Sequence, residues 1–160
     1  MLWFFLGFAM YLFTAHFVSY KLEKKRILES QAWGLNICCG KTDGGGINAD
    51  IFQHQDLPNF QLVDSIYNLP FKNKQFDSVL CSHTIEHVDS PELFFKELQR
   101  VGQQVTIVVP PLYDLAAVLN IFEHKHIFLT FKKEHHQLPG YIRLPFSNAL
   151  QNRIGQINNA

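Results

Sequence analysis

Residues 76–111, FDSVLCSHTIEHVDSPELFFKELQRVGQQVTIVVPP, have the pattern of a strand, a helix and a second strand. The apolar run 76–82 predicts the first strand, and the β-branched run 104–111 predicts the second. Between them, residues 90–102 predict a helix, with Ser90 at the N-cap position, a proline at the first helical position and a glycine at the end. Apolar and polar residues do not alternate strictly in either strand, so we expect both strands to be parallel and buried on both faces.

Three more short apolar runs precede this unit, each set between turn-forming residues. They are LNICC (35–39), INADI (47–51) and FQLVD (60–64). Together the runs predict an α/β fold with a mostly parallel sheet, in a domain that covers residues 34–146.

The carboxyl-terminal third offers fewer signals. DLAAVLNIFEHKH (114–126) favours a helix, and YIRLPF (141–146) is the one further strand that we predict there. We therefore expect the sheet to be truncated. Residues 147–160 are polar and predict a loose tail.

The connection between the first two strands is unusually short. Only residues 41–47 separate Gly40 from Asn48, whereas a parallel crossover normally takes a dozen or more residues. Seven extended residues reach at most about 25 Å, and a five-residue strand needs about 17 Å of return. An extended parallel return without a helix is therefore possible, and the alternative is an antiparallel hairpin.

The amino-terminal segment has a different composition from the rest. Residues 1–20 contain no Asp, Glu, Lys or Arg, and a helix of this length spans about 30 Å, the thickness of a bilayer core. The next six residues, KLEKKR, hold four cations, so the positive-inside rule puts the carboxyl-terminal domain in the cytoplasm. We expect a single-pass membrane anchor over 1–20 and a charged, helical connector over 21–33. The alternatives are a buried or interfacial helix, or an apolar lid.

Composition excludes several classes of protein. The 14 cations balance the 14 anions, so no basic excess indicates nucleic-acid binding. Three cysteines, two of them adjacent, cannot form a disulfide framework. A cleaved signal peptide carries its cations before the apolar run, whereas here they follow it.

The first three strand ends carry the groups of a nucleoside pocket. In open parallel sheets, ligands bind beyond the carboxyl ends of the strands. Gly40 follows the first strand, where a small residue lets a ligand approach the backbone. Asp50 ends the second strand, where a carboxylate can accept hydrogen bonds from ribose hydroxyls. Asp64 ends the third strand and can accept a hydrogen bond from an exocyclic amine.

These segments resemble the class I S-adenosylmethionine (SAM)-dependent methyltransferases, in particular the methyltransferase type 11 group. The resemblance covers residues 34–111 and rests on LNICCGKTDGGGINADI, VDSIYNLPF, the segment from FDSVLCS to ELQRV, and VTIVVPP. It implies a Rossmann-like, doubly wound sheet and SAM as the cofactor. The positions that it assigns to cofactor binding are Asn36, Cys38, Gly40, Asp50, Ile51, Asp64, Ser65, Ser82 and His83.

Two of these positions depart from the family pattern. The family usually has an acidic residue at the position of Asn36 and a glycine at the position of Cys38. A side chain at Cys38 occupies space close to the ligand, so we expect weakened cofactor binding. A non-catalytic scaffold or interaction module is therefore the alternative to an enzyme.

The resemblance implies methyl transfer to a small-molecule or lipid-linked acceptor; the membrane anchor suggests the lipid. His83, Glu86 and His87 are candidates for a general base, and none can be assigned from sequence. We expect no metal, because the histidines at 124, 126, 135 and 136 lack the usual ligand spacing. The oligomeric state is not predictable from the sequence.

Overall fold

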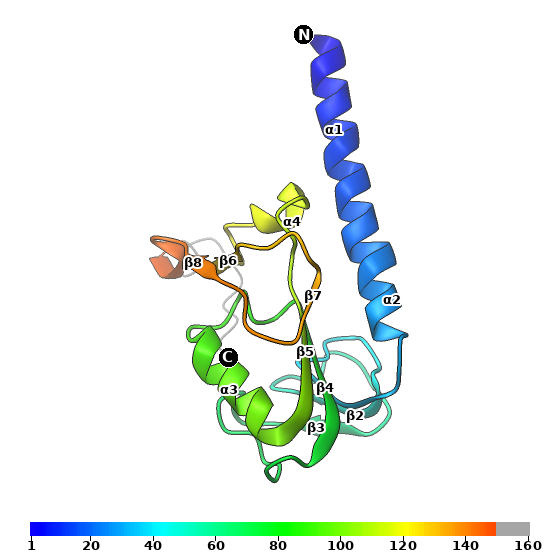
Figure 1. The fold of residues 1–160 in the computed structure, drawn as a ribbon, viewed down its shortest axis with the longest axis vertical. Helices are drawn as coiled ribbons and strands as arrows, with labels where there is room; N and C mark the ends of the chain where they lie inside the picture. Colours follow the sequence, from blue (N-terminus) through cyan, green and yellow to red (C-terminus); the bar gives the residue numbers. More distant parts are fainter. Residues whose placement is uncertain (150–160) are drawn as a thin grey trace.

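The computed structural model describes residues 1–149 of the chain. A long amino-terminal helix stands beside and above an α/β domain (Figure 1). The helical segments are α1 (Leu2–His16), the π-helical segment η1 (Phe17–Glu23), α2 (Lys24–Leu28), α3 (Pro91–Val101) and α4 (Leu115–Val118). The strands are β1 (Trp33–Ile37), β2 (Gly45–Asp50), β3 (Phe60–Leu62), β4 (Phe76–Ser82), β5 (Gly102–Val108), β6 (His126–Phe128), β7 (Glu134–His135) and β8 (Tyr141–Arg143).

The main sheet has six strands in the order β3-β2-β1-β4-β5-β7. The first five are parallel, and β7 pairs with β5 in the antiparallel direction. This confirms the predicted Rossmann-like, mostly parallel sheet. The carboxyl ends of β1, β2 and β4 lie side by side, which is the arrangement that a ligand site at this edge requires.

The part of the chain after β5 differs from the prediction: β6 and β7 were not predicted, and the two predicted elements have different bounds. The strand predicted over 141–146 is the shorter β8, which pairs with β6 in a separate ladder and does not join the main sheet. The helix predicted over 114–126 was wrong beyond Val118, where α4 ends. The amides of Lys125 and His126 donate to the Glu86 carbonyl (2.8 and 3.1 Å), so tertiary hydrogen bonds hold this segment outside a helix.

The short crossover is an extended parallel return, so the hairpin alternative is excluded. Trp33 pairs with Gly45 and Leu35 with Ile47 in parallel register. The return loop lies directly on the sheet. A Cβ atom on Gly44 would come within 2.5 Å of the Asn36 Cβ, which no side chain tolerates.

Two buried asparagines replace the apolar contacts that a crossover helix would make. Asn36 donates from Nδ2 to the Thr42 carbonyl (2.8 Å) and to the Asn48 Oδ1 (3.2 Å). The Asn48 Oδ1 also accepts from the Gly44 amide (2.9 Å). Polar side chains on this face of the sheet therefore form hydrogen bonds with the backbone groups of the loop that covers it.

The two faces of the sheet have separate apolar cores. Helix α3 begins at Pro91 as predicted, although the Ser90 side chain makes no capping hydrogen bond, and packs over the larger core with Phe94 and Leu98. On the other face, a smaller cluster joins Ile27, Trp33, Leu80 and Val108. The predicted connector is thus helical to Leu28 but belongs to the domain, because Ile27 is packed on the sheet.

The amino-terminal helix is long and apolar enough from Trp3 to Leu28 to cross a membrane. Only 6% of its most apolar 18-residue stretch is buried, whereas the core helix of a soluble protein is mostly buried. A signal sequence can have the same length and apolar composition. From Tyr11 onward, this helix makes polar contacts with the domain. Tyr11 donates to the Tyr113 carbonyl (2.7 Å), and Lys133 donates to the Ser19 hydroxyl (2.8 Å).

Candidate functional site

A cavity of about 280 Å³ opens at the carboxyl ends of β1, β2 and β4. This is the edge of the sheet where the sequence predicts the ligand site. The cavity is lined by Cys38, Gly40, Asp50, Ile51, Phe52, His54, His83, Thr84, His87, Val88 and Glu123. The lining therefore contains five of the nine residues predicted to bind cofactor.

Two backbone amides hold the Asp50 carboxylate in this cavity. Its Oδ2 accepts from the Gly40 amide (2.9 Å), and its Oδ1 accepts from the Ile51 amide (2.8 Å). The residue is only 6% exposed. A carboxylate offers about four lone-pair positions, so two backbone amides fix its orientation and leave positions for two further donors.

Gly40 and Cys38 form the β1 side of the cavity, and both have positive φ angles, +56° and +53°. A Cβ atom on Gly40 would have no atom within 4 Å, so the backbone of this glycine faces open space. Cys38 adopts the same left-handed conformation with a side chain, which costs about 1–3 kcal/mol. Burial raises the pKa of the Cys38 thiol, so the side chain stays a neutral thiol at pH 7.

His83 forms the β4 side of the cavity and also has a positive φ angle, +55°. Its Nδ1 lies 3.2 Å from the Glu86 Oε1, and its ring lies 5.5 Å from the ring of Tyr20 on the amino-terminal helix. Burial lowers the pKa of His83, although the Glu86 carboxylate opposes the shift. The imidazole is therefore neutral at pH 7.

Four of the predicted residues do not line the cavity. Asn36 is buried and holds the crossover loop, as described above. Asp64 is exposed, and the Ser65 hydroxyl accepts from the Tyr67 amide (3.2 Å). The Ser82 hydroxyl is buried without a hydrogen-bond partner among residues 1–149. Cofactor contact by these four residues stays a prediction.

Sequence reasoning did not select Phe52, His54, Thr84, Val88 or Glu123, all of which line the cavity. Phe52 and His54 follow Ile51 closely, so their position after a strand was a usable signal. Glu123 comes from the segment after α4, more than 70 residues from Asp50 in the chain. No local pattern indicates that this segment reaches the cavity.

A larger hollow of about 560 Å³ lies at the opposite end of the sheet, between the loop at Lys74 and the start of β5. It contains none of the strand-end residues named above. Because ligands of open parallel sheets bind at the carboxyl ends of the strands, we place the functional site at the smaller cavity.

The chain was compared with known families and structures. Residues 46–108 match the family model described as a methyltransferase domain. A SAM-dependent methyltransferase of Thermotoga maritima, described as a possible histamine N-methyltransferase, is 21% identical and covers 67% of this chain and 59% of its own, with a TM-score of 0.46. The PH0226 protein of Pyrococcus horikoshii OT3 is 15% identical and covers 88% of this chain and 80% of its own, with a TM-score of 0.47.

No curated protein matches the sequence. This chain spans 59% of the length of the Thermotoga structure. The matched segment 46–108 begins within β2 and ends with β5, so it contains the strands that carry Asp50 and His83 to the cavity. The match thus covers the central part of the mostly parallel sheet, and over residues 46–108 the chain is similar to a methyltransferase domain.

Proposed function

We propose that this protein transfers a methyl group from SAM to a small-molecule or lipid-linked acceptor. The observation that carries the proposal is the Asp50 carboxylate. It lines the cavity beside Gly40, is fixed by two backbone amides, and retains free acceptor positions. This is the arrangement needed to hold the two hydroxyls of a ribose.

The other cavity residues fit the remaining parts of the cofactor. Ile51 and Phe52 supply apolar surface next to Asp50 for an adenine ring. Gly40 lets a ligand approach its backbone closely, as the absence of neighbours around its would-be Cβ indicates. The volume, about 280 Å³, lies just below the usual 300–1,000 Å³ for ligand sites, and Cys38 is one of the residues that line it.

Asp50 and Gly40 would hold SAM in the cavity, and the cofactor would supply an electrophilic methyl group to the acceptor, with S-adenosylhomocysteine as the other product. The protein contributes position and proton transfer. Ionised Glu86 can only accept at its Oε1, so the His83 Nδ1 carries the proton and the His83 Nε2 presents a lone pair. That nitrogen is buried without a partner in the described residues and can take a proton from the acceptor.

The surface around the cavity supports a membrane-bound acceptor. Exposed apolar side chains surround the segment that contributes Glu123 to the cavity: Leu119, Ile121, Phe122, Leu129 and Phe131. In Figure 1, α4 lies beside the middle of the amino-terminal helix. If that helix enters the bilayer, this apolar rim faces the lipid and brings the cavity mouth within reach of a lipid-linked substrate. The cations at 21–26 then place the domain in the cytoplasm.

Calorimetric titration of S-adenosylhomocysteine into the full-length protein in lipid nanodiscs tests cofactor binding. We expect binding in the wild type, and at least a tenfold loss of affinity in Asp50→Ala, because hydrogen bonds to a charged group are worth about 1.5–3 kcal/mol. Asp56→Ala is the control, since this aspartate is exposed and outside the cavity. Equal affinity in the Asp50 and Asp56 variants would contradict the proposed site.

The strained Cys38 in the cavity favours a second candidate, a methyltransferase-like scaffold that no longer binds cofactor. Absence of heat at millimolar S-adenosylhomocysteine, with protein that is folded by circular dichroism, would support the scaffold.

Carbonate extraction of membranes tests the anchor separately. We expect the chain to remain in the membrane pellet at pH 11. Release into the supernatant would show that the amino-terminal helix does not span the bilayer.

A further inference from the structure

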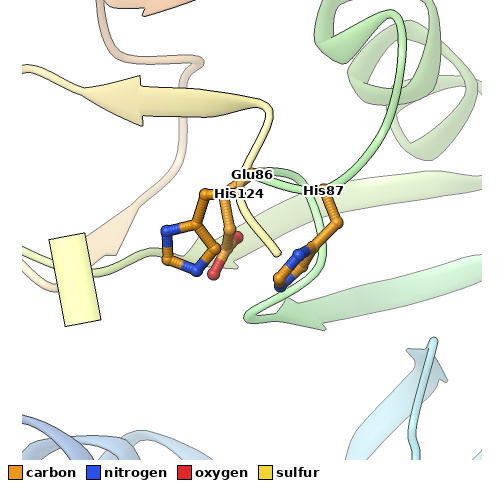
Figure 2. Close-up of side chains that lie close together, drawn as sticks. All are labelled: Glu86, His87 and His124. Atoms are coloured by element: carbon orange, nitrogen blue, oxygen red, sulfur yellow. The ribbon is translucent and has the colours of Figure 1, made fainter. Parts of the chain in front are cut away.

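A cluster of three ligand-type side chains lies behind the β4 wall of the cavity. Glu86 and His87 belong to the turn after β4, and His124 belongs to the segment between α4 and β6. One donor atom from each of the three lies within 4.8 Å of the other two. In Figure 2 the Glu86 carboxylate lies between the two imidazole rings.

The backbone holds these two segments together. The amides of Lys125 and His126 donate to the Glu86 carbonyl, at 2.8 and 3.1 Å. The His87 amide donates to the Thr84 carbonyl (2.8 Å), and the His124 amide donates to the Asn120 carbonyl (2.9 Å). The three side chains therefore start from fixed backbone positions, as a ligand site requires.

The hydrogen bonds of the cluster leave lone pairs available for a ligand. The His87 Nδ1 lies 2.9 Å from the Glu123 carbonyl oxygen, which only accepts, so Nδ1 carries the proton and Nε2 is a free donor of electrons. The Glu86 Oε1 accepts from His83. The Glu86 Oε2 is buried with no hydrogen-bond partner among the described residues, and the whole residue is 1% exposed.

Glu86 is the only carboxylate of the cluster, and among the described residues its side chain has one hydrogen bond, to His83. Lys133 is buried nearby, but its ammonium donates to Ser19. A buried carboxylate in such surroundings is stabilised by a bound cation.

We propose that Glu86, His87 and His124 bind a divalent transition-metal ion of the borderline class, for which Zn²⁺ is the reference. Two imidazoles and one carboxylate form a donor set that binds such ions in preference to Mg²⁺ or Ca²⁺. A tetrahedral ion with bonds of about 2.1 Å sets its ligand atoms about 3.4 Å apart, so side-chain rotation must draw the three atoms together on binding. Three protein ligands leave one coordination position open.

The position of the site gives the ion a role in the reaction; this step rests on the proposed methyl transfer. His87 also lines the cavity that contains Asp50, so a ligand in the cavity can reach the ion past this side chain. An acceptor hydroxyl at the open position would be oriented by the ion, and its pKa would be lowered. The site would then select acceptors that carry a hydroxyl or another oxygen donor.

Titration of the metal-free, full-length protein in nanodiscs with Co²⁺ and with Zn²⁺ tests the site without cofactor or acceptor. We expect one equivalent to bind, with Co²⁺ showing the visible absorption of a low-coordinate site that Zn²⁺ removes. Affinity should fall at least tenfold in Glu86→Gln and in His87→Ala, and remain within twofold of wild type in His135→Ala. His135 is a histidine of β7 outside the cluster. Circular dichroism establishes that each variant is folded.

Two results would overturn the assignment: no stoichiometric binding by folded wild-type protein, or unchanged Co²⁺ absorption in both Glu86→Gln and His87→Ala. Mg²⁺ that competes at equal concentration would contradict the proposed ion class. Because this titration contains no S-adenosylhomocysteine, its result is independent of the cofactor titration above. Metal binding without cofactor binding would keep the metal site and remove only its proposed role in methyl transfer.

Discussion

Cys38 occupies a position where the backbone has a left-handed conformation and the side chain enters the cavity. A non-glycine residue in this conformation is strained, and such strain is usually found where structure or function requires it. Here Cys38 lines the cavity together with Gly40. The residue that departs from the family pattern is thus part of the cavity wall.

Replacing Cys38 with glycine should enlarge the cavity and tighten cofactor binding. Glycine adopts a φ of +53° without strain, and the loss of the side chain opens the β1 wall. We expect S-adenosylhomocysteine to bind at least threefold more tightly in Cys38→Gly, as measured by calorimetry in nanodiscs. Cys39→Gly is not a matched control, because Cys39 is buried; Cys38→Ser keeps the volume and should leave affinity within twofold. Weaker binding in Cys38→Gly would show that the thiol contributes a contact.

At the scale of elements, residues 38–44 connect β1 to β2 without a helix. At the start of β2, Gly46 lets the two strands approach closely, because a Cβ atom there would lie 2.3 Å from the Trp33 carbonyl oxygen and 2.8 Å from that of Gly34. The loop can lie directly on the sheet only where side chains are absent and where Asn36 and Asn48 satisfy its backbone.

Gly46→Ala should therefore destabilise the domain. Forcing a methyl group against backbone carbonyls displaces β2 from β1, and overpacking of this kind costs about 1–3 kcal/mol. Urea unfolding followed by tryptophan fluorescence measures the change. Gly140→Ala is the control, because a Cβ atom there meets nothing within 4 Å, and it should change stability by less than about 0.5 kcal/mol. Equal stability of the two variants would contradict the close approach.

Glu97 and Arg100 form an ion pair on helix α3, and both side chains make hydrogen bonds to the loop before β4. The Glu97 Oε1 accepts from the Leu69 amide (2.7 Å), and Arg100 donates to the carbonyls of Leu69 and Phe71. The hydrogen bond from Arg100 is the main cause of a lowered pKa of Glu97, which burial opposes. The ionised carboxylate is thus stabilised in the folded state.

This ion pair should make the stability of the domain fall at acidic pH. Because the pKa of Glu97 is lower in the folded state, its contribution is fully present above the unfolded value near 4.5 and is lost as pH falls through the folded pKa. We expect Glu97→Gln to lower stability by about 1 kcal/mol at pH 7 and to show a smaller loss than wild type between pH 5 and pH 3. Thermal melts across this range measure both effects; parallel curves for the two proteins would exclude the assigned role.

At the scale of the whole molecule, the amino-terminal helix is docked on the domain beside the cavity. Lys133 lies at this junction, 5% exposed, with its ammonium donating to Ser19 of the helix. Burial lowers the pKa of Lys133 to about 8, although the charges of Asp114 and Glu86 oppose the shift. Docking of the helix therefore buries a lysine whose pKa is lower in the folded state than in the unfolded chain.

Stability should accordingly rise with pH above 8. Between the folded pKa near 8 and the unfolded value of 10.5, the unfolded chain binds the proton and the folded chain does not, so alkaline pH favours folding by up to about 3 kcal/mol. Lys133→Met should remove this rise and stabilise the protein at pH 7. Lys132→Met, at the exposed neighbouring position, should retain it. The urea midpoint between pH 7 and pH 10 measures the effect, and identical profiles for both variants would refute it.

The local sequence pattern was sufficient to predict the unit formed by β4, α3 and β5. Strand β4 has the predicted bounds, 76–82, and α3 lies within the predicted 90–102, because apolar spacing and the proline at the helix start act within a few residues. The approach of Gly40 to Asp50 was also predictable, since neighbouring parallel strands end at the same edge. Asp64 was expected there too, but it is exposed outside the cavity because β3 ends at Leu62.

The sequence by itself thus determined the order of strands and helices, the parallel sheet and the strand-end carboxylate, since these depend on periodicity and chain connectivity. Only the tertiary structure decided that Asn36 serves the crossover loop, that α4 ends at Val118, and that His124 meets Glu86 and His87. These outcomes depend on hydrogen bonds between segments tens of residues apart. No local propensity encodes such bonds, because their partners come together only when the chain has folded.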